Sequence, residues 1–445
     1  QTCALPISAP PAPAAAPAPA PPAPAFAGAP ATPIGQQLAW VLDVLVHRQG
    51  KVARAELDAH FHPSFYAAVP ADKLVEVLAQ LAPALAGATL GEVQASDTQL
   101  AAQVAAGAAK LRVLVAIDPT ARTITGLRIQ QDPAVAPLAS YDEARQKVAA
   151  LAPRATFLVA AVERGACRPL HDLAASEPLA IGSTFKLYVL LGLVDRILAS
   201  KATWNDELAI RDDWKSLPSG ITQNEPPGTK RTLATLAERM ISISDNTAAD
   251  HLLYWLGRKT VEATLRATGH AHPALDAPML STRELFALKL PADAKLVDRY
   301  LALGEAGRRS FLDKDLATAV PHVERAADWQ TARRIDRLEW FASSLDLCKL
   351  MATLAARAED PRAKPLLDLL AKNPGLPYDA KAWPYVGFKG GSEPGVLHMT
   401  FLLRRADDRW FVVTLGANAA EGGTVDPAVV APLAQALIAR VAADP

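Results

Sequence analysis

Ile181-Gly-Ser-Thr-Phe-Lys-Leu-Tyr-Val-Leu190 sets a serine and a lysine three residues apart at the start of an apolar run. The run predicts a helix, and side chains three positions apart in a helix lie on the same face. A serine hydroxyl is a poor nucleophile unless a base removes its proton, and a lysine whose ammonium is destabilised by burial can be that base. The pattern therefore predicts Ser183 as nucleophile, with its N–H at a helix N-terminus suited to an oxyanion, and Lys186 as base. Taken alone, the four-residue pattern is better explained by an exposed serine beside a solvated lysine.

A second polar cluster opens the helix that follows. Met240 to Leu253 reads MISISDNTAADHLL, so Ser244, Asp245 and Asn246 stand directly before an apolar run. Serine, aspartate and asparagine are all favoured N-cap residues, so this segment by itself predicts no more than the start of a helix.

A third element lies near the C-terminus, where residues 386–392 read VGFKGGS and precede two apolar runs that predict a hairpin. Glycines at 390 and 391 would let a substrate lie against the strand edge. The ammonium of Lys389 could attract a carboxylate and favour proton loss from Ser244, and the N–H of Ser392 would be a second oxyanion donor. A Gly-Gly pair in a hairpin is also an ordinary turn.

Taken together and in this order, the three elements resemble the S-x-x-K, S-D-N and K-T-G motifs of class A β-lactamases over about 300 residues. The resemblance implies an α/β domain at 136–445, with an antiparallel sheet flanked by helices and an all-helical subdomain that carries Ser183 and Ser244. It implies a serine hydrolase that forms an acyl-enzyme on β-lactams or related amides and esters. The implied catalytic residues are Ser183, Lys186 and Ser244, and the implied substrate-binding residues are Asn246, Lys389, Gly390, Gly391 and Ser392. No metal or cofactor is expected, because the chain lacks the clustered histidines of zinc enzymes.

Two features depart from that family. Class A enzymes hold the water for deacylation with a glutamate after S-D-N, whereas residues 270–290 contain only Glu284, which we interpret as a capping-box acid. The gap from Ser244 to Lys389 is also about 40 residues longer than usual, which predicts a helical insertion within 290–340. These departures, with Gly390 in place of threonine, leave an esterase or a slow penicillin-binding protein as an alternative. A non-catalytic binding module of the cell envelope is another.

The N-terminal third predicts no chemistry. Residues 1–7 look like a translated sequencing adapter, and 8–33 are almost only Ala and Pro, which predicts an extended tether. Residues 34–135 predict helices at 36–62 and 71–85, then four strands, so we expect an α+β domain with helices on one face of a curved antiparallel sheet. This pattern resembles nuclear-transport-factor-2-like or cyclase-like modules that precede β-lactamase-like domains in some actinobacterial lipoproteins and in a clavulanic-acid pathway protein. His60 and His62 are expected to face apart rather than bind a metal.

Composition limits the partners of the protein. Lys plus Arg equal Asp plus Glu at 46 each, which argues against nucleic-acid binding, and no apolar run is long enough for an integral membrane segment. We expect a monomer that acts on a small molecule. The family resemblance implies a periplasmic, secreted or cell-envelope protein whose export signal was lost with the true N-terminus.

Cys3, Cys167 and Cys348 match no disulfide framework, so we expect isolated thiols.

Overall fold

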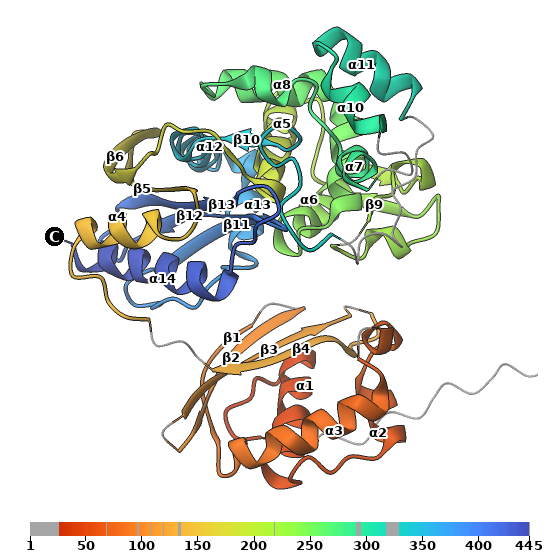
Figure 1. The fold of residues 1–445 in the computed structure, drawn as a ribbon, viewed down its shortest axis with the longest axis vertical. Coiled ribbons are helices and arrows are strands. Elements are labelled where there is room, and N and C mark those ends of the chain that lie inside the picture. Colours follow the sequence, from red (N-terminus) through yellow and green to blue (C-terminus); the bar gives the residue numbers. More distant parts are fainter. Residues whose placement is uncertain are drawn as a thin grey trace, which may run out of the picture. The chain divides into compact units, whose positions relative to one another are not determined.

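The computed structural model describes residues 26–67, 69–95, 98–107, 109–118, 120–131, 135–217, 219–290, 295–316 and 329–444. The adapter-like heptapeptide, most of the expected tether and Pro119 of an expected turn lie outside these residues. The chain divides between residues 132 and 133 into two compact units, which are coloured red to orange and orange to blue in Figure 1.

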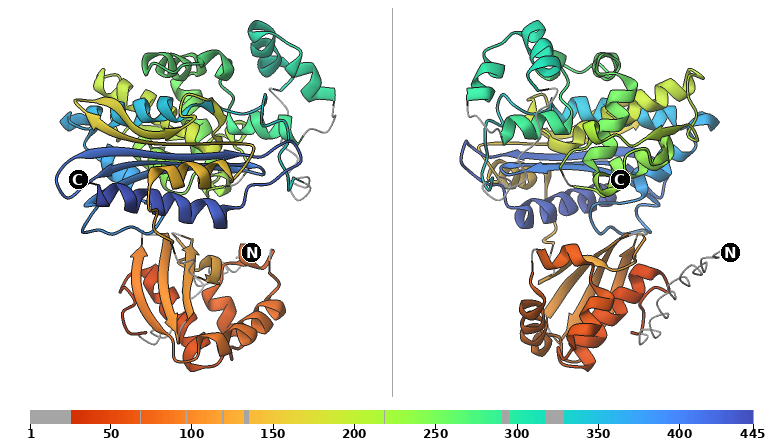
Figure 2. Two further views of the ribbon diagram at one scale, coloured as in Figure 1. Left: turned by 60° about the vertical axis from the view of Figure 1, so that its left-hand side comes forward. Right: turned by 90° about the vertical axis from the view of Figure 1, so that its right-hand side faces the viewer.

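The N-terminal unit is a four-stranded antiparallel sheet with helices on one face, which confirms the predicted α+β architecture (Figures 1 and 2). Its strands follow one another in chain order. The elements are α1 (Pro33–Leu42), α2 (Arg54–His60), α3 (Ala71–Leu81), β1 (Thr89–Ala95), β2 (Gln99–Ala106), β3 (Ala109–Ile117) and β4 (Ile124–Gln131).

Alternating residues of β3 explain why only one face of this sheet carries helices. Val113, Val115 and Ile117 are buried, and the residues between them are less so. Successive side chains of a strand point to opposite faces, so the apolar set turns to the helices. Phe26, within the expected tether, also packs into this core.

The two histidines of this unit do not share a site. His60 stacks on Trp40 with ring centroids 4.0 Å apart, and its Nδ1 lies 2.9 Å from Gln37 Oε1. His62 Nδ1 instead lies 2.7 Å from the Ser64 hydroxyl. Their separate partners agree with the expectation that the pair faces apart.

The C-terminal unit is built on a five-stranded antiparallel sheet in the order β11-β12-β13-β5-β6, with strands from both ends of the unit as the resemblance implied. Helices α4 and α14 cover one face and α12 packs on the other (Figures 1 and 2). The bounds are α4 (Tyr141–Ala149), β5 (Arg154–Glu163), β6 (Ala166–Leu173), α12 (Ser344–Arg357), β11 (Tyr385–Glu393), β12 (Val396–Arg404), β13 (Trp410–Asn418) and α14 (Pro427–Ala443).

The remaining helices form the all-helical part around α5, whose residues are almost all buried. They are α5 (Lys186–Leu198), α6 (Leu233–Ser242), α7 (Asn246–Leu256), α8 (Arg258–Ala267), α9 (Thr282–Lys289), α10 (Lys295–Leu301), α11 (Glu305–Lys314) and α13 (Pro365–Ala371). Short strands pair as β7 (Leu179–Ala180) with β10 (Phe341–Ala342) and β8 (Glu207–Ala209) with β9 (Lys230–Thr232). Helices α10 and α11 lie in the predicted insertion, of which 291–294 and 317–328 lie outside the described residues.

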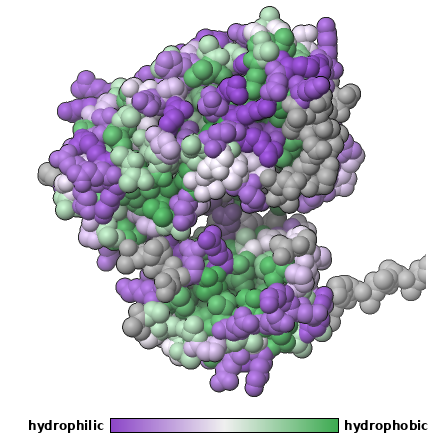
Figure 3. Space-filling view, in the orientation of Figure 1, coloured by the Kyte–Doolittle hydropathy of each residue, from purple (hydrophilic) through white to green (hydrophobic). Residues whose placement is uncertain are grey.

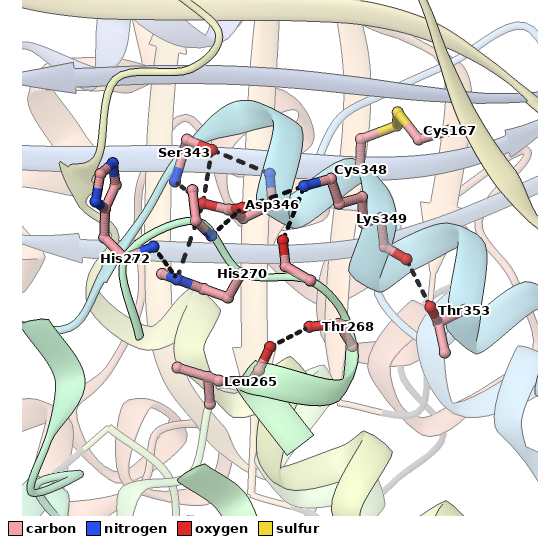
Figure 4. A network of polar contacts seen from close by, with 12 residues as sticks. Cys167, Leu265, Thr268, His270, His272, Ser343, Asp346, Cys348, Lys349 and Thr353 are labelled. Carbon is pink, nitrogen blue, oxygen red and sulfur yellow. Dashed lines mark hydrogen bonds and ion pairs between the residues drawn. A yellow bond between two sulfur atoms is a disulfide. The ribbon is translucent and has the colours of Figure 1, made fainter. Parts of the chain in front are cut away.

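Cys167 and Cys348 form a disulfide, so the expectation of isolated thiols was wrong for these two residues (Figure 4). They are 181 residues apart in sequence, on β6 and α12. Helix α12 packs across the sheet onto β6, and this contact exists only in the folded chain. Sequence spacing alone could not reveal it.

In the described part of the chain, no helix is long and apolar enough to span a bilayer. Hydrophilic and apolar residues lie side by side on the visible face of each unit (Figure 3). The exposed large apolar side chains include Leu170, Leu275, Leu303 and Val429, which stand far apart in sequence. Isolated exposed apolar residues are ordinary in folded proteins.

Candidate active site

Ser183 and Lys186 meet at the start of α5, as predicted. A 3₁₀ turn at Gly182–Phe185 carries Ser183, and α5 begins at Lys186. Gly182 has φ 49°, a left-handed conformation that lets the chain turn sharply into the helix. Lys186 Nζ lies 3.1 Å from Ser183 Oγ, so the two groups can exchange a proton.

Ser244 joins this pair from the turn between α6 and α7. Its φ is 56°, an unfavourable left-handed conformation for a serine, and such strained residues often lie at functional sites. Lys186 Nζ lies 3.2 Å from Ser244 Oγ. The same Nζ donates to the Ser244 carbonyl at 2.6 Å and to Asn246 Oδ1 at 2.7 Å. Asn246 is buried and its Nδ2 donates to the Leu217 carbonyl, so it orients Lys186 directly.

Asp245 holds the strained turn in place. Its carboxylate caps α7 through the N–H of Ala248 and accepts the N–H groups of Ile221 and Thr222 at 2.8 and 2.9 Å. A Cβ on Gly220 would lie 2.2 Å from Asp245 Cγ, so only glycine fits there. The interpretation of this motif as a helix cap is therefore confirmed, and its side chains also lie beside Lys186.

Ser219, in the loop before β9, is a further residue of the site, and no sequence motif identified it. Ser219 Oγ donates to the Ser244 carbonyl at 2.7 Å, the same carbonyl that accepts from Lys186. The available signal was the turn-forming pair Ser219-Gly220.

Lys389 approaches Ser244 from the opposite side, on β11. Its Nζ lies 3.0 Å from Ser244 Oγ and also donates to the Gly390 carbonyl. The side chain is buried, with 2% exposure. Ser244 Oγ therefore lies between two lysines, an arrangement suited to moving a proton through its hydroxyl.

A side chain is excluded at each of the two positions after Lys389 for a different reason. A Cβ on Gly391 would lie 1.9 Å from the Ile181 carbonyl oxygen and 2.7 Å from the Ser183 nitrogen, so β11 touches the Ser183 turn there. A Cβ on Gly390 would lie 2.8 Å from the ring of Phe388, which occupies the space a threonine side chain would need. Ser392 follows, exposed.

Burial sets the charge of both lysines. Burial lowers the pKa of Lys186 to about 7, although the charges of Asp245 and Asp250 oppose this shift. Burial also holds the pKa of Lys389 well below its ordinary value, and the charge of Lys186 adds to the effect. In the neutral amine, two N–H groups of Lys186 suffice for the Ser244 carbonyl and Asn246 Oδ1. The lone pair then remains for a hydroxyl proton.

The carboxylates of Glu284 in α9 and of Asp276 before it make structural hydrogen bonds. Glu284 forms the capping box of α9 with Ser281 and a bidentate ion pair with Arg258, which confirms its interpretation as a capping acid. Asp276 Oδ1 accepts the N–H of Phe341 at 2.8 Å.

Helix α12 anchors the start of that loop (Figure 4). Asp346 accepts the N–H of Ala271 at 2.9 Å, and Lys349 donates to the Gly269 carbonyl at 2.8 Å. Among the described residues, no carboxylate is hydrogen-bonded to Ser183 or Lys186. Nothing in this loop replaces the glutamate that class A enzymes use.

A family model described as the beta-lactamase enzyme family matches residues 144–444. The chain belongs to this family. A second family model, described as the N-terminal part of an ORF 12 gene product, matches residues 29–120 of this β-lactamase-family protein. That description names no nuclear-transport-factor-2-like module, so this part of the resemblance stays a prediction.

Several solved structures are similar to the C-terminal unit at low identity. A β-lactamase from Sphaerobacter thermophilus is 16% identical, with 69% of this chain and 99% of that chain covered and a TM-score of 0.48. A β-lactamase from Desulfarculus baarsii is 17% identical over 69% and 100%, with a TM-score of 0.46. PBP-A, as an L158E mutant in an acyl-enzyme complex with penicillin G, is 14% identical over 68% and 95%, with a TM-score of 0.45. None of the curated proteins compared with the chain matches it.

Proposed function

We propose that the protein is a serine acyl hydrolase that opens β-lactams or related cyclic amides and esters through an acyl-enzyme. The observation that carries the proposal is the buried Lys186 amine, which lies within hydrogen-bond distance of both Ser183 Oγ and Ser244 Oγ. Membership of the beta-lactamase enzyme family supports the same chemistry.

The acylation step follows from this geometry. Ser183 Oγ attacks the carbonyl carbon while its proton passes to Lys186 Nζ, and the oxyanion accepts the N–H groups of Ser183 and Ser392. When the acyl bond to the leaving group breaks, Ser244 Oγ gives that group a proton and is reprotonated from Lys186 or Lys389. The product is an ester of Ser183 that water must hydrolyse.

Slow deacylation is the second candidate outcome, and a specific observation favours it. Glu284 in α9 is engaged in a capping box and an ion pair, and Asp276 before α9 is buried and accepts the Phe341 N–H. Neither is hydrogen-bonded to Ser183 or Lys186, so neither is in place to act as base for a hydrolytic water. The protein would then acylate and stall, or would turn over only esters, whose acyl groups leave water a better approach.

Intact mass after incubation with a penicillin and with a chromogenic cephalosporin tests both outcomes, with ring opening followed optically. Wild type should gain the mass of the β-lactam, and Ser183→Ala should not. Ring opening beyond one equivalent indicates turnover, and a single equivalent indicates stalling. Wild-type protein with neither adduct nor ring opening would refute the β-lactam proposal and leave simple esters or a binding role.

We also propose that the protein works outside the cytoplasm. The Cys167–Cys348 disulfide supports this, because structural disulfides persist mainly in oxidising compartments. Expression in periplasm and in cytoplasm, with free thiols counted by alkylation and mass, tests it: two fewer thiols are expected only in the periplasmic protein.

A further inference from the structure

A buried lysine and two glutamates meet beside the end of β11, apart from the Ser183 cluster. Lys289 is the last residue of α9 and is 1% exposed. Its Nζ donates to Glu393 Oε1 at 2.6 Å and to the Arg333 carbonyl at 2.7 Å. Glu339 Oε1 lies 4.0 Å from the same Nζ, and the ring of Trp329 lies 5.6 Å from it. We call Lys289, Glu339 and Glu393 the charge clamp.

The two glutamates of the charge clamp share one cation, because Glu339 Oε1 and Glu393 Oε1 lie 4.0 and 2.6 Å from Lys289 Nζ. Glu339 Oε1 is buried and accepts no N–H or hydroxyl hydrogen bond from the described residues, which leaves it open to a proton on Glu393. Burial, and then the charge of Glu339, raise the pKa of Glu393 well above its ordinary value, although Lys289 opposes this. With one shared proton the three groups have no net charge, and a buried cluster without net charge has the smallest desolvation penalty.

The charged residues around Glu393 come from each element packed against it. Lys289 belongs to α9, and Glu339 precedes β10. Arg333 directs its guanidinium to the Lys289 carbonyl at 3.0 Å and so ties its segment to the same helix end. One cation therefore holds three separate stretches of chain together.

The charge clamp lies directly next to the proposed oxyanion donor. Glu393 follows Ser392 in β11, and since side chains alternate along a strand, Ser392 is exposed while Glu393 turns inward. A Cβ on Gly182 would lie 2.9 Å from the Ser392 nitrogen, so this N–H borders the Ser183 turn. At the hairpin end, a Cβ on Gly395 would lie 2.3 Å from Ala332 Cβ, so residues near 332 also press on β11–β12.

We propose that Lys289, Glu339 and Glu393 are positioning residues that hold the Ser392 N–H against the Ser183 turn for acyl transfer. This inference rests on the proposed function, because that N–H matters only if Ser183 attacks a carbonyl. When the shared proton leaves at alkaline pH, two carboxylates face one cation and repel each other. Acylation should then slow as pH rises, opposite to the acceleration expected from neutral Lys186.

Three variants test the charge clamp, with acylation measured as the rate of Ser183 labelling by a fluorophosphonate, read by intact mass. Lys289→Met removes the cation. Glu339→Gln places an amide that donates to Glu393 at every pH. Glu262→Gln is the matched control. Glu262 belongs to α8, its side chain is 4% exposed, and it pairs with Arg309 at 2.7 Å. Thermal unfolding is measured for each variant.

Lys289→Met should label at least about tenfold more slowly than wild type, since displacement of about 1 Å can cost 10²-fold in rate. Glu262→Gln should lose stability and keep its rate. Glu339→Gln should keep the neutral-pH rate and lose the alkaline decline. Equal rates for Lys289→Met and Glu262→Gln, or an alkaline decline that persists in Glu339→Gln, would overturn the clamp alone. Wild-type protein that no serine-directed probe labels would overturn the proposed function and the clamp together.

Discussion

Gly391→Ala should disable the site by pushing β11 away from the Ser183 turn. The added Cβ would lie 1.9 Å from the Ile181 carbonyl oxygen and 2.7 Å from the Ser183 and Thr184 nitrogens. An ordinary contact of that kind is about 3.4 Å, so the strand must retreat by roughly 1.5 Å. Overpacking of this kind typically costs about 1–3 kcal/mol of unfolding free energy. A displacement of about 1 Å can cost 10²-fold in rate, so labelling should slow at least about 100-fold.

The assay for this variant is fluorophosphonate labelling of Ser183 together with thermal unfolding. Gly257→Ala is the control, because Gly257 has φ 83° and only Thr260 Oγ1, at 3.9 Å, near its added Cβ. At φ 83° and ψ 130° an alanine is strained, so that variant should lose about 1–3 kcal/mol of unfolding free energy without touching the site. Gly391→Ala that labels as fast as Gly257→Ala would refute the close approach of β11 to the nucleophile.

Three further outcomes follow from the same structure. The labelling rate of the wild type should rise with pH through about 7, because burial lowers the pKa of Lys186 to about 7 and only its neutral amine accepts a proton. Lys186→Met should be labelled far more slowly at every pH. Reduction of Cys167–Cys348, or Cys348→Ser, should lower the thermal midpoint by up to about 10 °C, since a 181-residue loop corresponds to about 5 kcal/mol of chain entropy. Glu284→Gln should lower the free energy of unfolding by up to about 3 kcal/mol by leaving the partly buried Arg258 without its charged partner, yet any deacylation should persist at the wild-type rate. Differential scanning calorimetry and single-turnover mass spectrometry measure the last two.

The proximity of Ser183, Lys186 and Ser244 was predictable from the sequence because their motifs are local, whereas their catalytic roles stay a prediction. Ser183 and Lys186 share one helical turn, and Ser244 begins the next helix, so each segment specifies its own geometry. The antiparallel sheet of the C-terminal unit was implied by the resemblance to class A β-lactamases, and the order of its strands was not predicted.

Contacts between distant segments could not be predicted in this way. The Cys167–Cys348 disulfide and the Lys289–Glu393 pair join residues whose neighbours in sequence give no sign of each other. Phe388 is a third case: its ring fills the space beside Gly390, which explains why no threonine stands there, but the direction of that ring depends on the packing of the whole sheet edge.

If the protein forms an acyl-enzyme as proposed, the buried acids near Ser244 limit how that ester could be hydrolysed. Asp245 accepts N–H groups from Ile221 and Thr222. Asp250 accepts those of Thr282 and Arg283, and burial raises its pKa to about 7. Each carboxylate thus stabilises backbone that would otherwise be buried without a partner. Moving one of them to activate water would leave those N–H groups unsatisfied, at about 1–3 kcal/mol each. In the proposed mechanism a hydrolytic water would therefore rely on Lys186, which becomes a free base again when it, rather than Lys389, reprotonates Ser244.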